Sequence, residues 1–393
     1  MRAVDFFYSG IRSAARRFFI SIFRFFPINA GSVVFDNFNG GGFGCNPKYI
    51  AEALEADCLK LVWLARDLDS GDFPSYIKVV RYDSLRAWYY LETARVIVSN
   101  VRNSKGAIKR QGQKYVQTWH ASLGPKMVEK DAEKSLSRSY VKQAKKNGEE
   151  TDLMFANNEL MASVYRASFW YSGKLIRCGV PRNRDLIRCD TDVRRRVRAK
   201  LNLPENDFVC LYAPTWRDTE GEVPFFDFAK CRIALEKRFG SESVEVVLCV
   251  RFHPNTDRSQ YDISAESVVD LSDYPDTQEL LSAIDLLISD YSSIIEDFTF
   301  TSNPAFMYVP DYDRYIAHRQ FYYPLDKRPY PICRTEEDLY REIEVHSDEV
   351  LSDRLNLFRE EFGIMDDGLG ANTLADIVRG WTHSDTKLSS KLE

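Results

Sequence analysis

Asp285-Leu286-Leu287-Ile288-Ser289-Asp290-Tyr291-Ser292-Ser293 is an apolar run that ends in polar residues, and a helix-like segment, 294–301, follows it. The run predicts a buried strand over 285–289, and Ser292 or Ser293 is the expected N-cap of the helix. The first N–H groups of a helix are unpaired and carry partial positive charge, which suits a phosphate group. An ordinary serine cap without a ligand is the alternative.

Strands and helices alternate on both sides of this stretch. In the second half we expect further strands at 208–212, 245–251, 268–271 and 305–308, with helices at 227–239 and 277–284. In the first half we expect strands at 32–35, 59–64, 77–81, 96–99, 115–118 and 153–156, and helices that include 84–94 and 158–169. Such alternation predicts parallel sheets.

The chain has 393 residues, which corresponds to two domains at roughly 100–200 residues each. Residues 180–206 break the alternation with Pro181, Pro204 and Arg194-Arg195-Arg196, and are interpreted as a linker with a surface helix. The expected fold class is α/β, with two Rossmann-like, doubly wound domains. The expected division is an N-terminal helix over 1–28, domains over 29–190 and 200–382, and a polar tail over 383–393.

Charge and composition exclude several classes of function. The net charge of -5 argues against a general nucleic-acid-binding protein. The eight cysteines form no C-x-x-C pair, which argues against structural zinc and for a reducing compartment. Neither a P-loop nor a protein-kinase motif set is present. No metal or cofactor is therefore expected.

Residues 2–26 carry five arginines, one acid and a phenylalanine-rich stripe at helical spacing. No apolar run reaches the roughly 18 residues that a membrane span needs. A basic, aromatic helix suits the surface of an anionic membrane, and a helix packed on the protein's own surface is the alternative. The residues expected to contact the membrane are Arg12, Arg16, Arg17, Phe18, Phe19 and Phe25.

Ligands of open α/β sheets lie beyond the carboxyl ends of the strands, so residues that follow strands are candidates for the site. Arg251 and His253 follow one expected strand, and Thr215-Trp216-Arg217 follows another. In the first half His120 follows the strand 115–118, as a candidate general base. The alternatives are a surface turn around His253 and a loop packed by Trp216.

Four strings occur in a specific order: Gln117-Thr118-Trp119-His120, Tyr212-Ala213-Pro214-Thr215-Trp216-Arg217-Asp218, Arg251-Phe252-His253-Pro254 and Ser289-Asp290-Tyr291-Ser292-Ser293. With Asn46-Pro47-Lys48-Tyr49 they resemble the CDP-glycerol glycerophosphotransferases of teichoic-acid and capsule synthesis, over roughly residues 32–380. The family is similar to GT-B enzymes, in which a cleft separates two Rossmann-like domains. The resemblance implies that the C-terminal domain holds CDP-glycerol, or a related CDP-polyol such as CDP-ribitol. It also implies that the N-terminal domain binds the acceptor and supplies the base.

Two departures from the family pattern concern the acceptor. The family continues the first His as Gly-Thr-Pro-Leu-Lys, whereas this chain has one more residue, Ala121-Ser122-Leu123-Gly124-Pro125-Lys126. The family has Gly after Arg in a later string, where this chain has Gln320. Both leave the acceptor's identity open more than the type of reaction.

The resulting expectation is transfer of glycerol phosphate from CDP-glycerol to an acceptor hydroxyl, with release of CMP. The acceptor is a lipid-linked or saccharide or polyol-phosphate molecule, and the enzyme is peripheral on the cytoplasmic face of a bacterial membrane. The expected catalytic residues are His120 and His253, and the expected donor-binding residues are Thr215, Arg217, Arg251, Asp290, Ser292 and Ser293. The alternatives are a GT-B glycosyltransferase that uses a nucleotide sugar, and a non-catalytic protein of the membrane surface.

Overall fold

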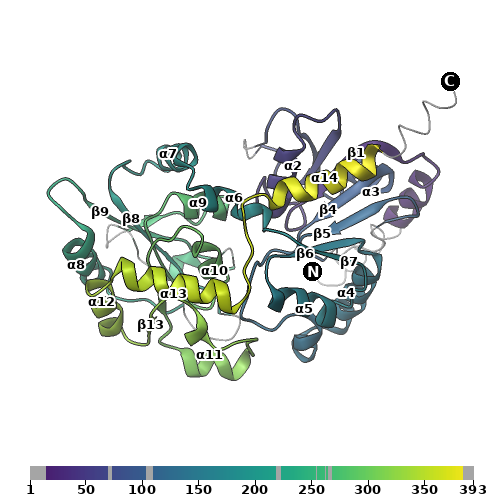
Figure 1. Ribbon diagram of the computed structural model, residues 1–393. Helices are drawn as coiled ribbons and strands as arrows, with labels where there is room; N and C mark the ends of the chain where they lie inside the picture. The colour runs from purple at the N-terminus through teal and green to yellow at the C-terminus, as the bar shows by residue number, and fades with distance from the viewer. Residues whose placement is uncertain are drawn as a thin grey trace.

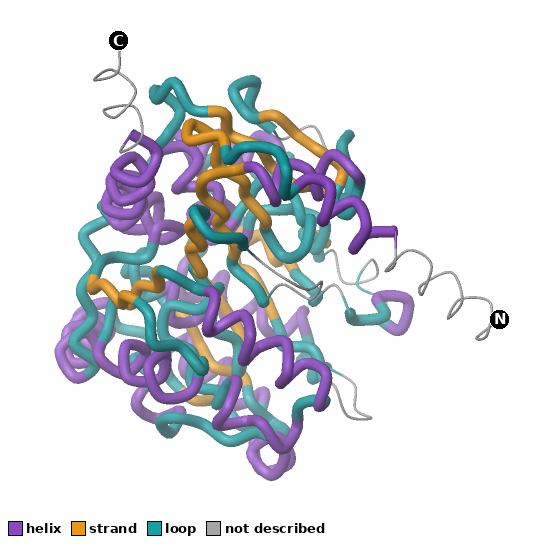
Figure 2. Tube along the Cα trace, turned by 90° about the vertical axis from the view of Figure 1, so that its right-hand side faces the viewer, coloured by secondary structure: helices purple, strands orange, loops and turns teal. Residues whose placement is uncertain are grey.

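The structure is a computed structural model that describes residues 15–69, 73–102, 109–217, 223–253, 255–261, 263 and 268–383. These residues form two parallel sheets, each in its own half of the molecule (Figure 1). Helices lie outside the strands in both halves, as the view turned by 90° shows (Figure 2). The predicted fold class, two Rossmann-like α/β domains, is confirmed.

The first sheet has the strand order β3 (Lys78–Arg81), β2 (Lys60–Ala65), β1 (Asn29–Asp36), β4 (Ala94–Ser99), β5 (Lys114–Gln117), β6 (Leu153–Ala156) and β7 (Lys174–Arg177). Its helices include α2 (Cys45–Ala53), α3 (Leu85–Thr93), α4 (Arg138–Glu150) and α5 (Glu159–Ser168). Val33, Val34 and Phe35 of β1 are fully buried, because helices cover both faces of a parallel sheet. Strand β7 was not predicted, since it is a short edge strand with a charged residue at each end.

The second sheet has the order β10 (Val269–Asp270), β9 (Val246–Val250), β8 (Phe208–Ala213), β11 (Leu286–Ser289), β12 (Ala305–Tyr308) and β13 (Ile332–Cys333). Its helices include α8 (Phe228–Phe239), α9 (Thr277–Ser282), α10 (Ile294–Phe298), α11 (Tyr312–His318), α12 (Glu336–Glu344) and α13 (Asp348–Glu361). The apolar stretch quoted first is β11, which pairs with β8 and β12. The strand order reverses between β8 and β11, which is where open α/β sheets bind ligands.

The segment 180–206, interpreted above as a linker with a surface helix, is in part a buried element. It forms η2 (Pro181–Asn183), α6 (Arg184–Arg188) and α7 (Thr191–Lys200). Arg198 of α7 is only 1% exposed. Its guanidinium donates to Asp285 at 2.6 Å and to the carbonyl groups of Ala283, Pro204, Glu205 and Asp207. The charge run itself lies on the outer side of α7, where Arg195 and Arg196 are exposed, whereas Arg198 on the inner side fixes the start of β11.

The last helix, α14 (Gly370–His383), lies on the first sheet and not on the second (Figure 1). Leu374, Ala375 and Val378 join the same core cluster as Val33 and Ile50. Gly370 meets Gly179 so closely that a Cβ built on it would lie 2.0 Å from the Gly179 carbonyl oxygen. The last helix of the expected domain 200–382 therefore belongs to the first half of the molecule, and the chain crosses between the halves twice.

At the N-terminal end, residues 15–23 are helical, and residues 1–14 lie outside the described part of the chain. This helix packs on α3, where the ring centroids of Phe23 and Tyr89 lie 5.6 Å apart. Just after the helix, Arg24 forms an ion pair at 2.9 Å with Glu92 of α3. Among the described residues, no helix is both long and apolar enough to cross a membrane.

Replacing Arg198 by Ala should destabilise the second half by about 3 kcal/mol, because it leaves several buried carbonyl groups without their donor and removes one of the two arginines that pair with Asp285. For a domain of this size, that lowers the thermal midpoint by roughly 6–12 °C. The matched control is Arg195→Ala on the exposed side of the same helix, which should leave the midpoint nearly unchanged. Equal midpoints for the two variants, measured by calorimetry, would contradict a structural role for Arg198.

Candidate active site

His120 follows β5 on a sharp turn in which Trp119 has a φ of 53°. The ring stacks on Trp119, with centroids 4.4 Å apart, and its Nδ1 lies 2.8 Å from the Asn100 carbonyl oxygen. A carbonyl only accepts, so Nδ1 carries the proton and Nε2 presents a lone pair. Burial lowers the pKa of His120 to about 4, so the ring is neutral at pH 7. His120 therefore has the tautomer that a general base needs.

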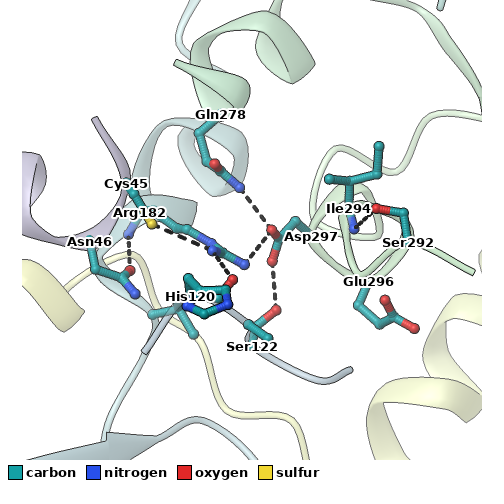
Figure 3. Close-up of polar contacts among 12 residues, drawn as sticks. Cys45, Asn46, His120, Ser122, Arg182, Gln278, Ser292, Ile294, Glu296 and Asp297 are labelled. Atoms are coloured by element: carbon teal, nitrogen blue, oxygen red, sulfur yellow. Dashed lines mark hydrogen bonds and ion pairs between the residues drawn. The ribbon is translucent and has the colours of Figure 1, made fainter. Parts of the chain in front are cut away.

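A buried network joins the loop after His120 to the second half of the chain (Figure 3). Asp297 of α10 accepts from the Ser122 hydroxyl at 2.6 Å, from the Arg182 guanidinium at 2.6 Å and from the Gln278 amide at 2.8 Å. Arg182 also donates to the His120 carbonyl oxygen at 2.6 Å. Arg182 thus links the backbone of the candidate base to a carboxylate of the half that is expected to bind the donor.

The loop after His120 also lies against the start of α10. A Cβ built on Gly124 would lie 4.0 Å from the Cβ of Ser293. The Ser293 residue occupies the N-cap position, but its side chain makes no capping hydrogen bond, whereas Ser292 accepts weakly from the Ile294 N–H at 3.4 Å. Neither hydroxyl donates a hydrogen bond to another of the described residues. Ser293 therefore has the predicted N-cap position, but its side chain does not act as the ordinary capping serine of the alternative interpretation.

His253 follows β9, and its ring lies on Trp216 with centroids 6.1 Å apart. The backbone N–H of Asn255 donates to His253 Nδ1 at 3.2 Å. Nδ1 must then be unprotonated, so the neutral ring carries its proton on Nε2. Burial lowers the pKa of His253, and the positive charges of Lys126 and Arg251 lower it further. His253 thus has the opposite polarity to His120, because it offers an N–H where His120 offers a lone pair.

The remaining expected donor-binding residues are engaged within the protein. Arg251 donates to the carbonyl groups of Leu271 and Tyr274, and Arg217 pairs with Asp290 at 2.9 Å and with Asp311 at 2.8 Å. Asp290 accepts from both the backbone and the hydroxyl of Thr215. These contacts position the loops after β8, β9 and β11. Direct contact of these residues with a donor stays a prediction.

Arg328 is a residue of the site that the sequence did not indicate. It is 4% exposed, and it donates to Glu296 at 2.6 Å and to the carbonyl groups of Asp290 and Ser292. It therefore fixes the loop that carries the two serines. Arg182, Gln278 and Asp297 were missed as well. Arg182 follows β7, which was not predicted, and Gln278 and Asp297 lie within helices, so the strand-end criterion could not select them.

The residues expected at a membrane differ in their exposure. Phe18 is 63% and Phe25 is 90% exposed, and Arg17 is also exposed. Phe19 and Arg16 are half-buried, and the Arg16 guanidinium lies 6.0 Å from the Trp88 ring centroid. Arg12 lies outside the described residues.

Within the described part of the chain, no three or more His, Cys, Asp or Glu side chains are placed to hold a metal ion. All eight cysteines are free thiols.

Comparison with known proteins identifies the family of the chain. The family model for CDP-Glycerol:Poly(glycerophosphate) glycerophosphotransferase matches residues 18–380. A teichoic acid poly(glycerol phosphate) polymerase of Bacillus spizizenii is 28% identical over 94% of this chain and 98% of its own length. A polymerase of the same name from Staphylococcus epidermidis is 26% identical over 91% of this chain, which spans about half of that longer protein (51%).

Among solved structures, a variant of the wall teichoic acid polymerase TagF soaked with CDPG is 25% identical, with a TM-score of 0.82. The match covers all of this chain and 97% of that one. The family match removes the nucleotide-sugar and non-catalytic alternatives. The chain belongs to the CDP-glycerol:poly(glycerophosphate) glycerophosphotransferase family and is an enzyme that transfers glycerol phosphate.

Proposed function

We propose that the two halves of the chain divide the reaction between them, with CDP-glycerol on the second half and the acceptor on the first. The reaction is the glycerophosphate transfer of teichoic-acid synthesis that the family performs. The observation that carries the division is the opposite polarity of the two histidines: His120 presents a lone pair and His253 presents an N–H. The first suits removal of a proton, and the second suits binding of a phosphate oxygen.

In the proposed reaction, an acceptor hydroxyl attacks the β-phosphorus of CDP-glycerol. A phosphorus–oxygen bond forms to the acceptor, the bond to CMP breaks, and the hydroxyl proton passes to Nε2 of His120. Phosphoryl transfer asks a protein mainly for positioning and stabilisation of charge. The Nε2–H of His253 and the hydroxyls of Ser292 and Ser293 would donate to the diphosphate and stabilise the charge that grows on CMP.

The partners follow from the same division. A related CDP-polyol such as CDP-ribitol is the second donor to test, and the acceptor is a lipid-linked or saccharide or polyol-phosphate hydroxyl. The exposed rings of Phe18 and Phe25, with the exposed Arg17 beside them, form an aromatic and basic surface. Such a surface suits an anionic membrane, which supports the proposal that the enzyme is peripheral at the cytoplasmic face of the cell membrane.

Replacing His120 by Ala should reduce CMP release by about 10²–10⁴-fold, because the acceptor hydroxyl then lacks its base. The affinity for CDP-glycerol should change little, since the donor lies on the other half. The control is His346→Gln, because that ring packs on Phe239 and Phe306 inside the second half. Near-normal turnover of His120→Ala would remove the residue from this role.

Replacing Ser292 and Ser293 together by Ala should weaken CDP-glycerol binding by about 10- to 100-fold, since hydrogen bonds to a charged group contribute about 1.5–3 kcal/mol. Calorimetric titration with CDP-glycerol measures this affinity. Ser139→Ala, at an exposed serine of α4, serves as the control. Unchanged affinity in the double variant would mean that the diphosphate does not lie at the start of α10.

Replacing Phe18 and Phe25 together by Ser should weaken binding to vesicles that contain phosphatidylglycerol by at least about tenfold, because two exposed rings would no longer enter the lipid. Flotation of the full chain with vesicles measures this binding. Leu357→Ser removes a comparably exposed apolar side chain from α13 and should have no effect. Equal flotation of both variants would exclude this surface as the membrane contact.

A further inference from the structure

Lys126 belongs to the first half of the chain but lies on the second. Its loop runs antiparallel to residues 320–322, with a bridge between Lys126 and Phe321. The Met127 N–H donates to the Gln320 carbonyl oxygen at 2.9 Å, and the Tyr322 N–H donates to the Pro125 carbonyl oxygen at 2.6 Å. The backbone of both halves therefore holds this lysine at the boundary between them, six residues after His120.

The side chain of Lys126 is half-buried among other cations. Its ammonium lies 5.5 Å from the centroid of the Tyr315 ring, which stacks on Tyr291. The pKa of Lys126 is affected by the charges of Asp290, Arg217, Arg319 and Arg328, and the charge of Lys126 in turn affects the pKa of His253. Asp290 is the single acid of this set, and it is already bonded to Arg217 and Thr215. Within the described residues, no ion pair joins Lys126 to a carboxylate.

Burial and the neighbouring arginines lower the pKa of Lys126 to about 8. A buried ammonium that faces further cations is costly unless an anion neutralises it. The neighbouring features show which anion fits. The loop that carries Lys126 passes close to Ser293 at the start of α10, where a Cβ built on Gly124 would lie 4.0 Å from the Ser293 Cβ, and the charge of Lys126 lowers the pKa of His253. These are the groups to which the diphosphate is assigned, and His120 lies at the other end of the same loop.

We propose that Lys126 is a further catalytic residue, a cation from the acceptor-binding half that binds the non-bridging oxygens of the phosphoryl group being transferred. The inference rests on the proposed function and adds a residue that bridges donor and acceptor. Lys126 forms no covalent bond and keeps its proton throughout. The bond to CMP breaks with its electron pair, the acceptor oxygen bonds to phosphorus, and the acceptor proton goes to His120.

The first test is the pH dependence of kcat/KM for CDP-glycerol, measured by CMP release. Lys126 is charged below its pKa, so its contribution is present below about pH 8 and is lost as the pH rises through that value. The arginine of Lys126→Arg stays charged above pH 8, so the decrease in kcat/KM at alkaline pH should move to higher pH in this variant. The kcat/KM of Lys126→Met should be about 10²–10³-fold lower at pH 7 and should show no further decrease as the pH rises through 8. Lys130→Met, an exposed lysine just beyond the loop, is the control. Near-normal turnover of Lys126→Met overturns the proposal.

The second test does not depend on turnover, and it uses inorganic pyrophosphate as the ligand. Calorimetry at pH 7 should give an affinity about 10- to 100-fold weaker for Lys126→Met than for the natural chain, with Lys130→Met unchanged. The affinity for CMP, which lacks the transferred phosphoryl group, should change little. Unchanged pyrophosphate affinity in Lys126→Met overturns the proposal even if turnover falls, because the lysine would then be structural. Pyrophosphate binding through Lys126 without any release of CMP from CDP-glycerol would contradict the proposed function and leave the anion site standing.

Discussion

The relative position of the two halves depends on the buried carboxylate of Asp297. It is 1% exposed, and it accepts hydrogen bonds from Ser122 in the first half, from Arg182 where the chain first crosses, and from Gln278 in the second half. A buried carboxylate is tolerated only when it is paired and fully hydrogen-bonded, and removing one partner of such a pair costs about 3–5 kcal/mol. Because Arg182 also holds the His120 carbonyl, this contact sets where the candidate base stands relative to the start of α10.

The environment of each histidine then assigns its chemistry. A carbonyl fixes the proton on Nδ1 of His120, and a backbone N–H excludes it from Nδ1 of His253. Burial keeps both rings uncharged near neutral pH, since it lowers the pKa of each. Positive charge at the candidate site therefore comes from groups other than the histidines. Of these, Lys126 is not neutralised by a carboxylate within the described residues, which leaves it available to a substrate phosphate.

Sequence reasoning identified most strands of both sheets, because apolar runs such as 286–289 are long enough to stand out. It missed β7 and β13, which are short edge strands, and it missed the return of α14 to the first sheet, which no local pattern encodes. His120, His253 and the serine pair were selected as candidates because they follow strands. Arg182, Asp297 and Arg328 were not, since their importance comes from contacts between segments far apart in the chain. The two departures from the family pattern, the longer loop after His120 and Gln320, contact each other where this loop pairs with residues 320–322 of the second half.

The most direct test of the proposed division of the reaction is a crystal structure of the His120→Ala chain with CDP-glycerol bound. The arrangement of the loops predicts that the diphosphate lies at the start of α10, within hydrogen-bonding distance of Ser292, Ser293 and His253 Nε2. Lys126 should contact the phosphate that carries the glycerol, and that phosphorus should face position 120. A diphosphate bound away from the start of α10, or a glycerol phosphate turned away from position 120, would contradict the division of the reaction between the two halves.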